Sequence, residues 1–377
     1  MIPFNKPHLT GKEVHYIYEA VHSGKISGNG IFTKKCHEFF TSNFNFAKAL
    51  MTTSCTDALE MSSLLMNIEP GDEIILPTFT FVSTANAFVL RGAKLVFVDS
   101  LSSEPNMDVH AIEALITPKT KAIVVVHYAG VACDMDVVMK LSKKHNVYVV
   151  EDAAQAIDSY YKGQPLGGIG DFGAFSFHET KNIIAGEGGL LVVNNGKYID
   201  RSEIIWEKGT NRSAFFRGET DKYGWVDVGS SFLPSELISA FLFAQLENLK
   251  DIQQKRLELW TRYYEKLNVL ANNGLLRLPF IPEYATNNAH MFYVICRSLE
   301  ERTALMKHLK ENNILSVFHY LSLHASPYFT DKHDGRSMKQ SDQYADSLLR
   351  LPLFYDLTND EHDHICNTIL AFYSNKI

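Results

Sequence analysis

The sequence lacks the features that mark membrane and secreted proteins. No uninterrupted apolar run reaches the ~18 residues that span a bilayer, because the best one, residues 122–133, contains His127. The N-terminus has no basic segment followed by an apolar stretch, so we expect no signal peptide. The five cysteines form neither a Cys-x-x-Cys pair nor a zinc spacing, which is typical of reduced thiols. These absences predict a soluble, cytoplasmic protein with no metal site and no membrane partner.

Strong charge of one sign is also absent. The 36 basic and 43 acidic residues give a formal net charge of -7 and form no long run of one sign, so the sequence predicts no nucleic-acid partner. No Gly-x-Gly-x-x-Gly motif follows the first predicted strand, which argues against an NAD-dependent enzyme. With 377 residues and 46% apolar content, the chain can bury a large core, and its length favours two domains.

What the sequence does contain is a regular alternation of strand and helix patterns. Between about residues 45 and 195, short β-branched apolar runs alternate with longer helical patterns, which is typical of a parallel α/β fold. The runs are too apolar to leave a face in water, so we expect a buried, mostly parallel sheet flanked by helices. The expected strands are 73–76, 94–99, 122–127, 147–151, 174–177 and 190–193, and the expected helices are 55–66, 82–91, 135–144 and 233–249.

The pattern changes near residue 250. A helical stretch over 234–270 leads to predicted strands at 290–296 and 314–319 with a helix at 301–312 between them. We therefore expect a large domain over residues 1–250 and a smaller C-terminal α+β domain over residues 251–377. The polar segment 331–340 contains no Phe, Tyr or Trp and is predicted to be a surface loop.

Two ionisable residues stand at the ends of neighbouring predicted strands. Asp152 ends an apolar strand, where an unpaired carboxylate would cost several kcal/mol, and Lys181 follows another strand just ahead of the glycine-rich run 186–189. An aspartate against a pyridinium nitrogen and a lysine on an aldehyde carbon are the pair that pyridoxal phosphate (PLP) requires. Taken singly, Asp152 is equally well a helix N-cap and Lys181 a surface lysine. Their conjunction favours a PLP site.

Two further segments fit such a site. Small and hydroxyl residues at 52–57, including Ser54 and Thr56, lead into a helix whose N-terminus could bind a phosphate, although ordinary N-capping explains the run equally well. Phe81 follows a strand and could stack on a cofactor ring, although most aromatics so placed belong to a core. His127 ends a buried strand, and we interpret it as structural.

Taken together, these residues resemble the DegT/DnrJ/EryC1/StrS family of sugar aminotransferases over nearly the whole chain. Six family landmarks stand in order, at 54–59, 77–86, 151–155, 176–181, 186–189 and 317–324. The resemblance implies a PLP-dependent transferase of fold type I, like aspartate aminotransferase. It also implies a homodimer in which each active site is completed by the other subunit.

The resemblance assigns a role to each cofactor-binding position. It makes Lys181 the Schiff-base lysine and Asp152 the partner of the pyridine nitrogen. Ser231, a shorter side chain, stands where many relatives supply an asparagine from the partner subunit to the phosphate. The remaining implied contacts are Phe81 on the ring, Gln155 near the ring hydroxyl, and Cys55, Thr56 and Ser176 at the phosphate.

Within the family, the sequence most resembles the transaminases that use L-glutamate to convert dTDP-4-keto-6-deoxyglucose into dTDP-4-amino-4,6-dideoxygalactose. Amination at C3, or formation of the other C4 epimer, stays open. A PLP-dependent 3-dehydratase would carry histidine in place of Lys181, and a non-catalytic relative would have lost the lysine. The candidate substrate contacts are Lys208 and Arg212 for the diphosphate, Tyr320 and His324 for the sugar, and His178 for cofactor or substrate. Each is equally consistent with an ordinary surface charge or a core histidine.

Overall fold

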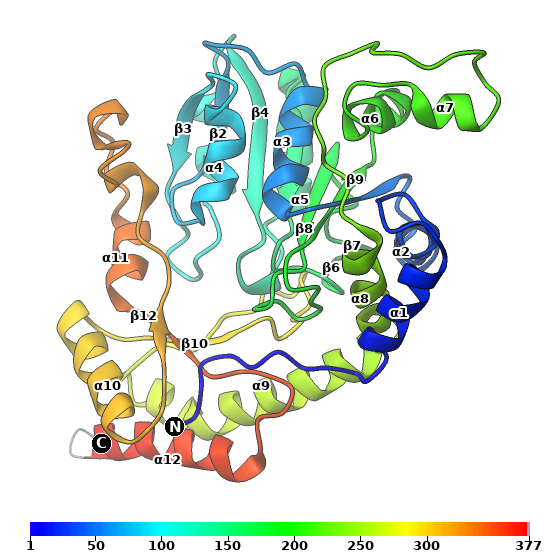
Figure 1. Cartoon of the computed structure of the whole chain (residues 1–377). Coiled ribbons are helices and arrows are strands. Elements are labelled where there is room, and N and C mark those ends of the chain that lie inside the picture. Colours follow the sequence, from blue (N-terminus) through cyan, green and yellow to red (C-terminus); the bar gives the residue numbers. More distant parts are fainter. Residues whose placement is uncertain (375–377) are drawn as a thin grey trace.

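A central seven-stranded sheet forms the core of the computed structural model, which describes residues 1–374 (Figure 1). The strands are β1 (Ala49–Thr52), β2 (Glu73–Pro77), β3 (Lys94–Val98), β4 (Thr120–Val126), β5 (Tyr148–Asp152), β8 (Phe172–Ser176) and β9 (Gly189–Val193). They lie in the order β1-β9-β8-β5-β4-β2-β3. The neighbours from β8 to β3 pair in parallel, and β9 is antiparallel to both β8 and β1. The predicted α/β class and mostly parallel sheet are confirmed.

All six strands predicted from the alternating pattern are present. The pattern missed β1, a four-residue strand at the sheet edge, and β6 (Tyr160–Tyr161) and β7 (Gln164–Pro165), which form a separate two-stranded sheet. These strands are too short to show a period.

Helices cover both faces of the central sheet, and others pack on a smaller C-terminal sheet. Their bounds are α1 (Glu13–His22), α2 (Ile31–Phe44), α3 (Cys55–Leu65), α4 (Val82–Val89), α5 (Met135–His145), α6 (Ile199–Trp206), α7 (Arg212–Phe216), α8 (Glu236–Leu246), α9 (Leu249–Asn272), α10 (Leu299–Glu311), α11 (Lys339–Ser347) and α12 (Asn359–Tyr373). The long helical stretch predicted over 234–270 is in fact two helices, because the chain turns at Glu247 and Asn248.

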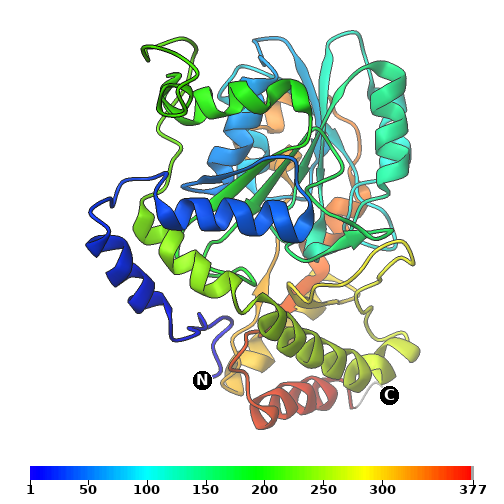
Figure 2. The same cartoon turned by 90° about the vertical axis from the view of Figure 1, so that its right-hand side faces the viewer.

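Alternate side chains along each strand enter different cores. Ile75 packs with α2, α5 and α8 on one face, whereas Ile74 and Leu76 pack with α3, α4 and α6 on the other. Figure 2 shows α2, in blue, crossing in front of the first of these faces. Burial on both faces explains the uninterrupted apolar runs of the central strands.

A smaller sheet lies beneath the first. It consists of β10 (Phe292–Ile295), β12 (Leu348–Leu351) and β11 (Val317–Phe318), with β12 in the centre. It packs with α9, α10 and α12 around a separate hydrophobic cluster, which Ile2 also joins. On this basis we propose that the two domains divide near residue 250. The first residues of the chain nevertheless pack on the C-terminal domain, because the Ile2 N–H donates a 2.7 Å hydrogen bond to the Asn313 carbonyl.

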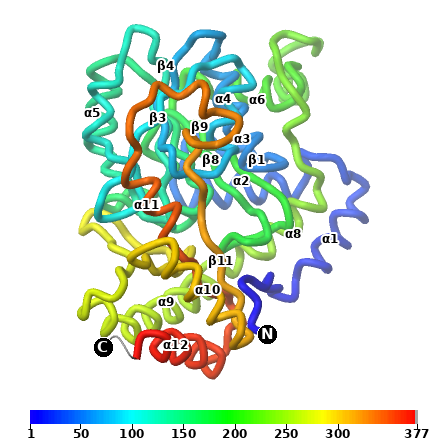
Figure 3. The backbone as a smooth tube through the Cα atoms, turned by 90° about the vertical axis from the view of Figure 1, so that its left-hand side faces the viewer, coloured from blue at the N-terminus to red at the C-terminus, as the bar shows by residue number. Residues whose placement is uncertain are grey.

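The segment after β11 returns to the large sheet. Figure 3 shows this orange segment rising past β3 and α4 before it descends into α11. The Leu323 N–H donates to the Thr78 carbonyl at 2.9 Å, and the ring of Phe329 meets that of Phe97 at 4.8 Å. Most of the predicted 331–340 loop lies at the surface, and α11 begins at Lys339. None of the helices in residues 1–374 combines the length and apolar character that a membrane crossing needs.

Candidate functional site

A cavity of about 820 Å³ lies where the parallel strands end and helices α3 and α4 begin. Val126, Asp152 and Ser176 are the last residues of β4, β5 and β8, and all three line it. This is the carboxyl edge of the sheet, where α/β folds bind their ligands. Residues of the small sheet and of the segment after β11 close the opposite side. The cavity is therefore built from parts of the chain that lie far apart in sequence.

Asp152 is a buried carboxylate aimed into this cavity. Its Oδ2 accepts a 2.6 Å hydrogen bond from the Thr84 hydroxyl, and its Oδ1 accepts one of 3.1 Å from the Ala154 N–H. Burial raises the pKa of Asp152, while these hydrogen bonds and the charge of Lys181 oppose the rise. An anion held in this way attracts a cationic partner.

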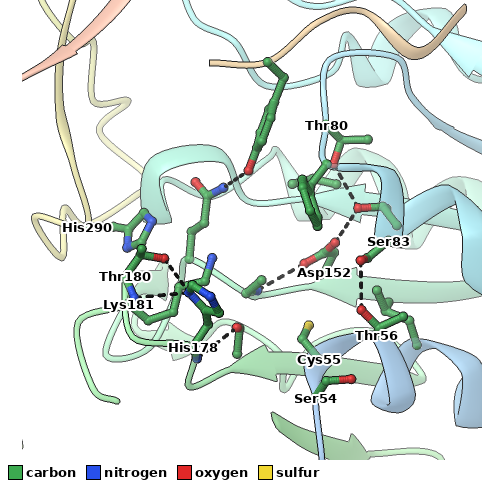
Figure 4. Close-up of a pocket in the computed structure, with 18 of the residues that line it drawn as sticks. Ser54, Cys55, Thr56, Thr80, Ser83, Asp152, His178, Thr180, Lys181 and His290 are labelled. Carbon is green, nitrogen blue, oxygen red and sulfur yellow. Dashed lines mark hydrogen bonds between the residues drawn. The ribbon is translucent and has the colours of Figure 1, made fainter. Parts of the chain in front are cut away.

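Lys181 enters the cavity from the side opposite Asp152, beside His178 and Thr180 (Figure 4). Its backbone N–H donates to the His178 carbonyl at 2.9 Å in the tight turn after β8. Burial lowers the pKa of Lys181, whereas Cys55 and Asp152 act to raise it. A lysine with a lowered pKa carries more neutral amine, which is the nucleophilic form.

The N-terminus of α3 forms the floor of the cavity. Ser54 caps the helix by accepting a 3.1 Å hydrogen bond from the Asp57 N–H, and the Thr56 hydroxyl donates to Ser83 at 2.8 Å. A Cβ on Gly189 would lie 2.3 Å from the Ser54 carbonyl carbon, so β9 presses directly on this turn. First-turn N–H groups have no partner within a helix, and they favour anions.

Gln155, Tyr320 and Phe81 lie around the middle of the cavity. The Gln155 side chain accepts from the Ala129 N–H at 2.6 Å and donates to the Tyr320 hydroxyl at 3.1 Å. The Phe81 ring is 6.1 Å from the Tyr320 ring, and Phe81 is 56% exposed. A planar ligand could therefore cover the Phe81 ring.

His178 is held at the rim of the cavity. Its Nδ1 accepts from the Thr180 N–H at 3.2 Å and lies 2.9 Å from the Thr180 hydroxyl. The other ring nitrogen lies 3.8 Å from Glu187. Of the residues predicted from sequence, Lys181, Asp152, Gln155, Phe81, Cys55, Thr56, Ser176, His178 and Tyr320 line one cavity.

Four predicted residues do not line this cavity within a single chain. Ser231 pairs with Glu207, and the Lys208 N–H donates to the Ser230 carbonyl at 3.1 Å. The other two are Arg212, which lies over the Phe216 ring at 5.2 Å, and His324, whose Nδ1 is 3.0 Å from the Thr78 hydroxyl. Their roles stay predictions, and that of Ser231 refers to a second subunit.

Comparison with known proteins identifies the kind of protein that carries this cavity. The model of the DegT/DnrJ/EryC1/StrS aminotransferase family matches residues 7–370. The chain belongs to this family. It is similar to GDP-perosamine synthase from Escherichia coli O157:H7, with 32% identity over 376 residues that cover 100% of this chain and 99% of the relative.

Solved structures agree with this assignment. The aminotransferase TlmJ from Streptoalloteichus hindustanus is 26% identical, with a TM-score of 0.91 and 100% of both chains covered. Spr1654 from Streptococcus pneumoniae in its PLP form is also 26% identical, with a TM-score of 0.90, and the match covers 100% of this chain and 99% of that one. The protein is a PLP-dependent sugar aminotransferase of the DegT/DnrJ/EryC1/StrS family.

The cavity of this family member fits PLP by its own chemistry. Asp152 supplies a buried carboxylate, Lys181 a buried amine, and the first turn of α3 an anion site. The close approach of Gly189 leaves no room for a side chain between β9 and that turn.

The sequence interpretation missed several residues of the site. Thr84 and Thr80 lie one turn apart in and before α4, and Thr84 bonds Asp152. His290, His319 and Arg350 line the cavity from the C-terminal part of the chain. Arg350 had a signal, because it is the one charged residue in the run Leu348 to Leu353. The predicted strands did not include that run.

Proposed function

We propose that this sugar aminotransferase transfers the amino group of L-glutamate to C4 of dTDP-4-keto-6-deoxyglucose. The products are dTDP-4-amino-4,6-dideoxygalactose and 2-oxoglutarate. The observation that carries the proposal is that Lys181 and Asp152 line one cavity from opposite sides, above the N-terminus of α3. The name of GDP-perosamine synthase supports a nucleotide-linked sugar as the acceptor.

Each residue of the cavity has a distinct task in this proposal. When bound, PLP supplies an aldehyde that forms an imine with the donor and a ring that accepts electron density from the donor α-carbon. Asp152 holds the ring nitrogen in its protonated state, and the first turn of α3 with Thr56 and Ser176 holds the phosphate. Gln155 faces the ring hydroxyl, and Phe81 packs on the ring.

Lys181 moves the proton. With PLP bound, its Nζ would hold the cofactor until the donor amine takes its place, and the freed amine would then act as general base and acid, moving a proton from the donor α-carbon to the C4' position of the cofactor. The lowered pKa of Lys181 supports this task, because burial favours the neutral amine that can accept a proton. In the second half of the reaction the same Nζ would move a proton back from the C4' position to C4 of the sugar.

A homodimer is part of the proposal. The segment around Ser231 exposes several large apolar side chains, and Trp225 is 85% exposed. Exposed apolar groups gathered on one segment are typical of an interface. Ser231 would reach the phosphate in the partner's cavity, and Lys208 and Arg212 in the same segment would contact the diphosphate, with Tyr320 and His324 at the sugar.

The test is to incubate the protein with PLP, L-glutamate and dTDP-4-keto-6-deoxyglucose and to assign the product by NMR. We expect a 4-amino sugar with an axial amine. A 3-amino sugar from the 3-keto isomer, an equatorial amine, or a dehydrated sugar would overturn the substrate assignment. Lys181→Ala should lose both turnover and the absorbance of the lysine-bound cofactor, and retention of both would exclude Lys181 from its role.

A further inference from the structure

Arg350 brings a positive charge from the small sheet into the cavity. It lies in β12, the central strand, opposite Tyr293 of β10 and Val317 of β11. Leu349 and Leu351 point into the C-terminal cluster, so the alternation of the strand turns Arg350 to the other face. There it lines the same cavity as Lys181. The Phe4 ring supports the guanidinium from a distance of 4.7 Å.

This guanidinium has no anionic partner in the part of the chain that the structure describes. It takes part in no ion pair there, and its buried Nε makes no hydrogen bond. Burial lowers the pKa of Arg350, opposed only by Tyr128 and Tyr320. An arginine nevertheless stays charged, and a partly buried charge without a partner is unfavourable.

The groups next to Arg350 cannot neutralise it. Burial, together with the charges of Lys181 and Arg350, holds the pKa of His290 and of His319 well below the usual range, so both rings are neutral at pH 7. Burial raises the pKa of Tyr320, so its phenol keeps its proton. None of these rings supplies a negative charge to Arg350, so an anion that pairs with it has to come with the substrate.

We infer that Arg350 binds a carboxylate of the amino donor, an inference that rests on the proposed function. The planar guanidinium matches a carboxylate with two parallel hydrogen bonds. A donor held there lies at the Lys181 end of the cavity, because Arg350 lines a small adjoining cavity together with Thr180, the residue before Lys181. The diphosphate of a nucleotide sugar is the competing anion. The donor half of the reaction separates the two anions, because it contains no nucleotide sugar.

The donor half of the reaction tests this inference without any sugar. We would add L-glutamate to the PLP-loaded enzyme and follow the loss of cofactor absorbance. In Arg350→Gln the half-saturating glutamate concentration should rise roughly 10- to 100-fold, the range for losing hydrogen bonds to a charged group. The KM for the nucleotide sugar should not change.

Arg302 offers a matched control. It too has a buried Nε without a hydrogen bond and lies over an aromatic ring, that of Phe318, at 5.4 Å. It bonds the Ala345 carbonyl and does not line the cavity. Arg302→Gln should leave the half-saturating glutamate concentration unchanged.

A binding measurement adds a readout that needs no chemistry. Glutarate, a dicarboxylate without an amine, should bind the PLP-loaded enzyme in calorimetry, and Arg350→Gln should abolish the binding. Unchanged glutamate saturation and glutarate binding in that variant, or a raised KM for the nucleotide sugar alone, would overturn the inference. If Arg350→Gln fails to fold, Arg350→Lys is the variant to test, because it keeps the positive charge and loses the pair of parallel N–H donors. An unchanged half-saturating glutamate concentration in Arg350→Lys would again overturn the inference. An enzyme that reacts with glutamate and not with the dTDP sugar would refute the proposed acceptor and leave Arg350 in place.

Discussion

The Thr84 hydroxyl donates a 2.6 Å hydrogen bond to the Asp152 carboxylate, which joins helix α4 to the end of strand β5. A hydroxyl has one hydrogen, so the 2.9 Å contact between Thr84 and Thr80 must use the Thr80 hydrogen. The chain of hydroxyls therefore points toward the carboxylate and stabilises its charged form. Asp152 stays able to face a ring nitrogen even though burial raises its pKa.

Replacing Thr84 with valine should move the acid limb of the donor half-reaction to higher pH. The Thr84 hydrogen bond lowers the pKa of Asp152, so its loss raises that pKa, and the carboxylate is protonated at a higher pH than before. At a fixed acidic pH the rate should fall about tenfold or more, since hydrogen bonds to charged groups contribute about 1.5–3 kcal/mol. A pH series of stopped-flow absorbance traces measures this shift.

Thr84→Ser is the control for that change. It keeps the hydroxyl, so its acid limb should stay close to that of the unmodified enzyme. Equal pH profiles for Thr84→Ser and Thr84→Val would mean that the hydroxyl does not tune Asp152.

Lys181 should capture PLP through a neutral amine at lower pH than an ordinary lysine. Burial lowers the pKa of Lys181, and the Arg350 charge contributes to that lowering. The rate of PLP incorporation into the apoenzyme should therefore rise with pH through a midpoint below 10.5, the ordinary lysine value. In Arg350→Gln the midpoint should move up, because one opposing positive charge is gone. A midpoint at the ordinary lysine value in both proteins would contradict this account of Lys181.

The place of Asp152 and Lys181 in a site could be predicted from sequence, whereas the place of Arg350 could not, although its charge within the apolar run Leu348 to Leu353 was visible. The first two stand at the ends of long apolar strands, and a charged residue at such a place is visible in the pattern. The strand that carries Arg350 has four residues, too few for a period to show. Its position in the cavity depends on the pairing of β12 between β10 and β11, which brings together segments far apart in sequence.

The turn between α8 and α9 shows the same limit at the level of the fold. Helical residues continue on both sides of Glu247 and Asn248, so local preference does not mark the break. Tertiary packing sets the break, because Leu246 and Leu249 enter the same core from two different helices. The phosphate site could be predicted in part. The sequence showed the N-cap at Ser54, but it did not show that Gly189 contacts that turn.

Gly189→Ala should weaken PLP binding. The added Cβ would lie 2.3 Å from the Ser54 carbonyl carbon and 2.5 Å from the Cys55 nitrogen, so the first turn of α3 must shift. Because that turn is the proposed phosphate site, the equilibrium constant for PLP dissociation should rise, which fluorescence titration of the apoenzyme would measure. Gly196→Ala is a suitable control, since a Cβ there meets nothing within 4 Å and its φ is not positive. Equal PLP affinity in the two variants would remove Gly189 from the phosphate site.

Trp225 should support a dimer that completes the phosphate site. It is 85% exposed in the single chain and belongs to the segment that leads to Ser231. Trp225→Glu would place a charge in the proposed interface, so sedimentation analysis should show a shift from dimer toward monomer. The monomer should also bind PLP more weakly, because each cavity would lose the partner's Ser231.

Tyr328→Glu is the control, since Tyr328 is 61% exposed and lies on the segment after β11. A Trp225→Glu protein that stays dimeric would refute this interface, and a monomer with unchanged PLP affinity would separate the interface from the cofactor site.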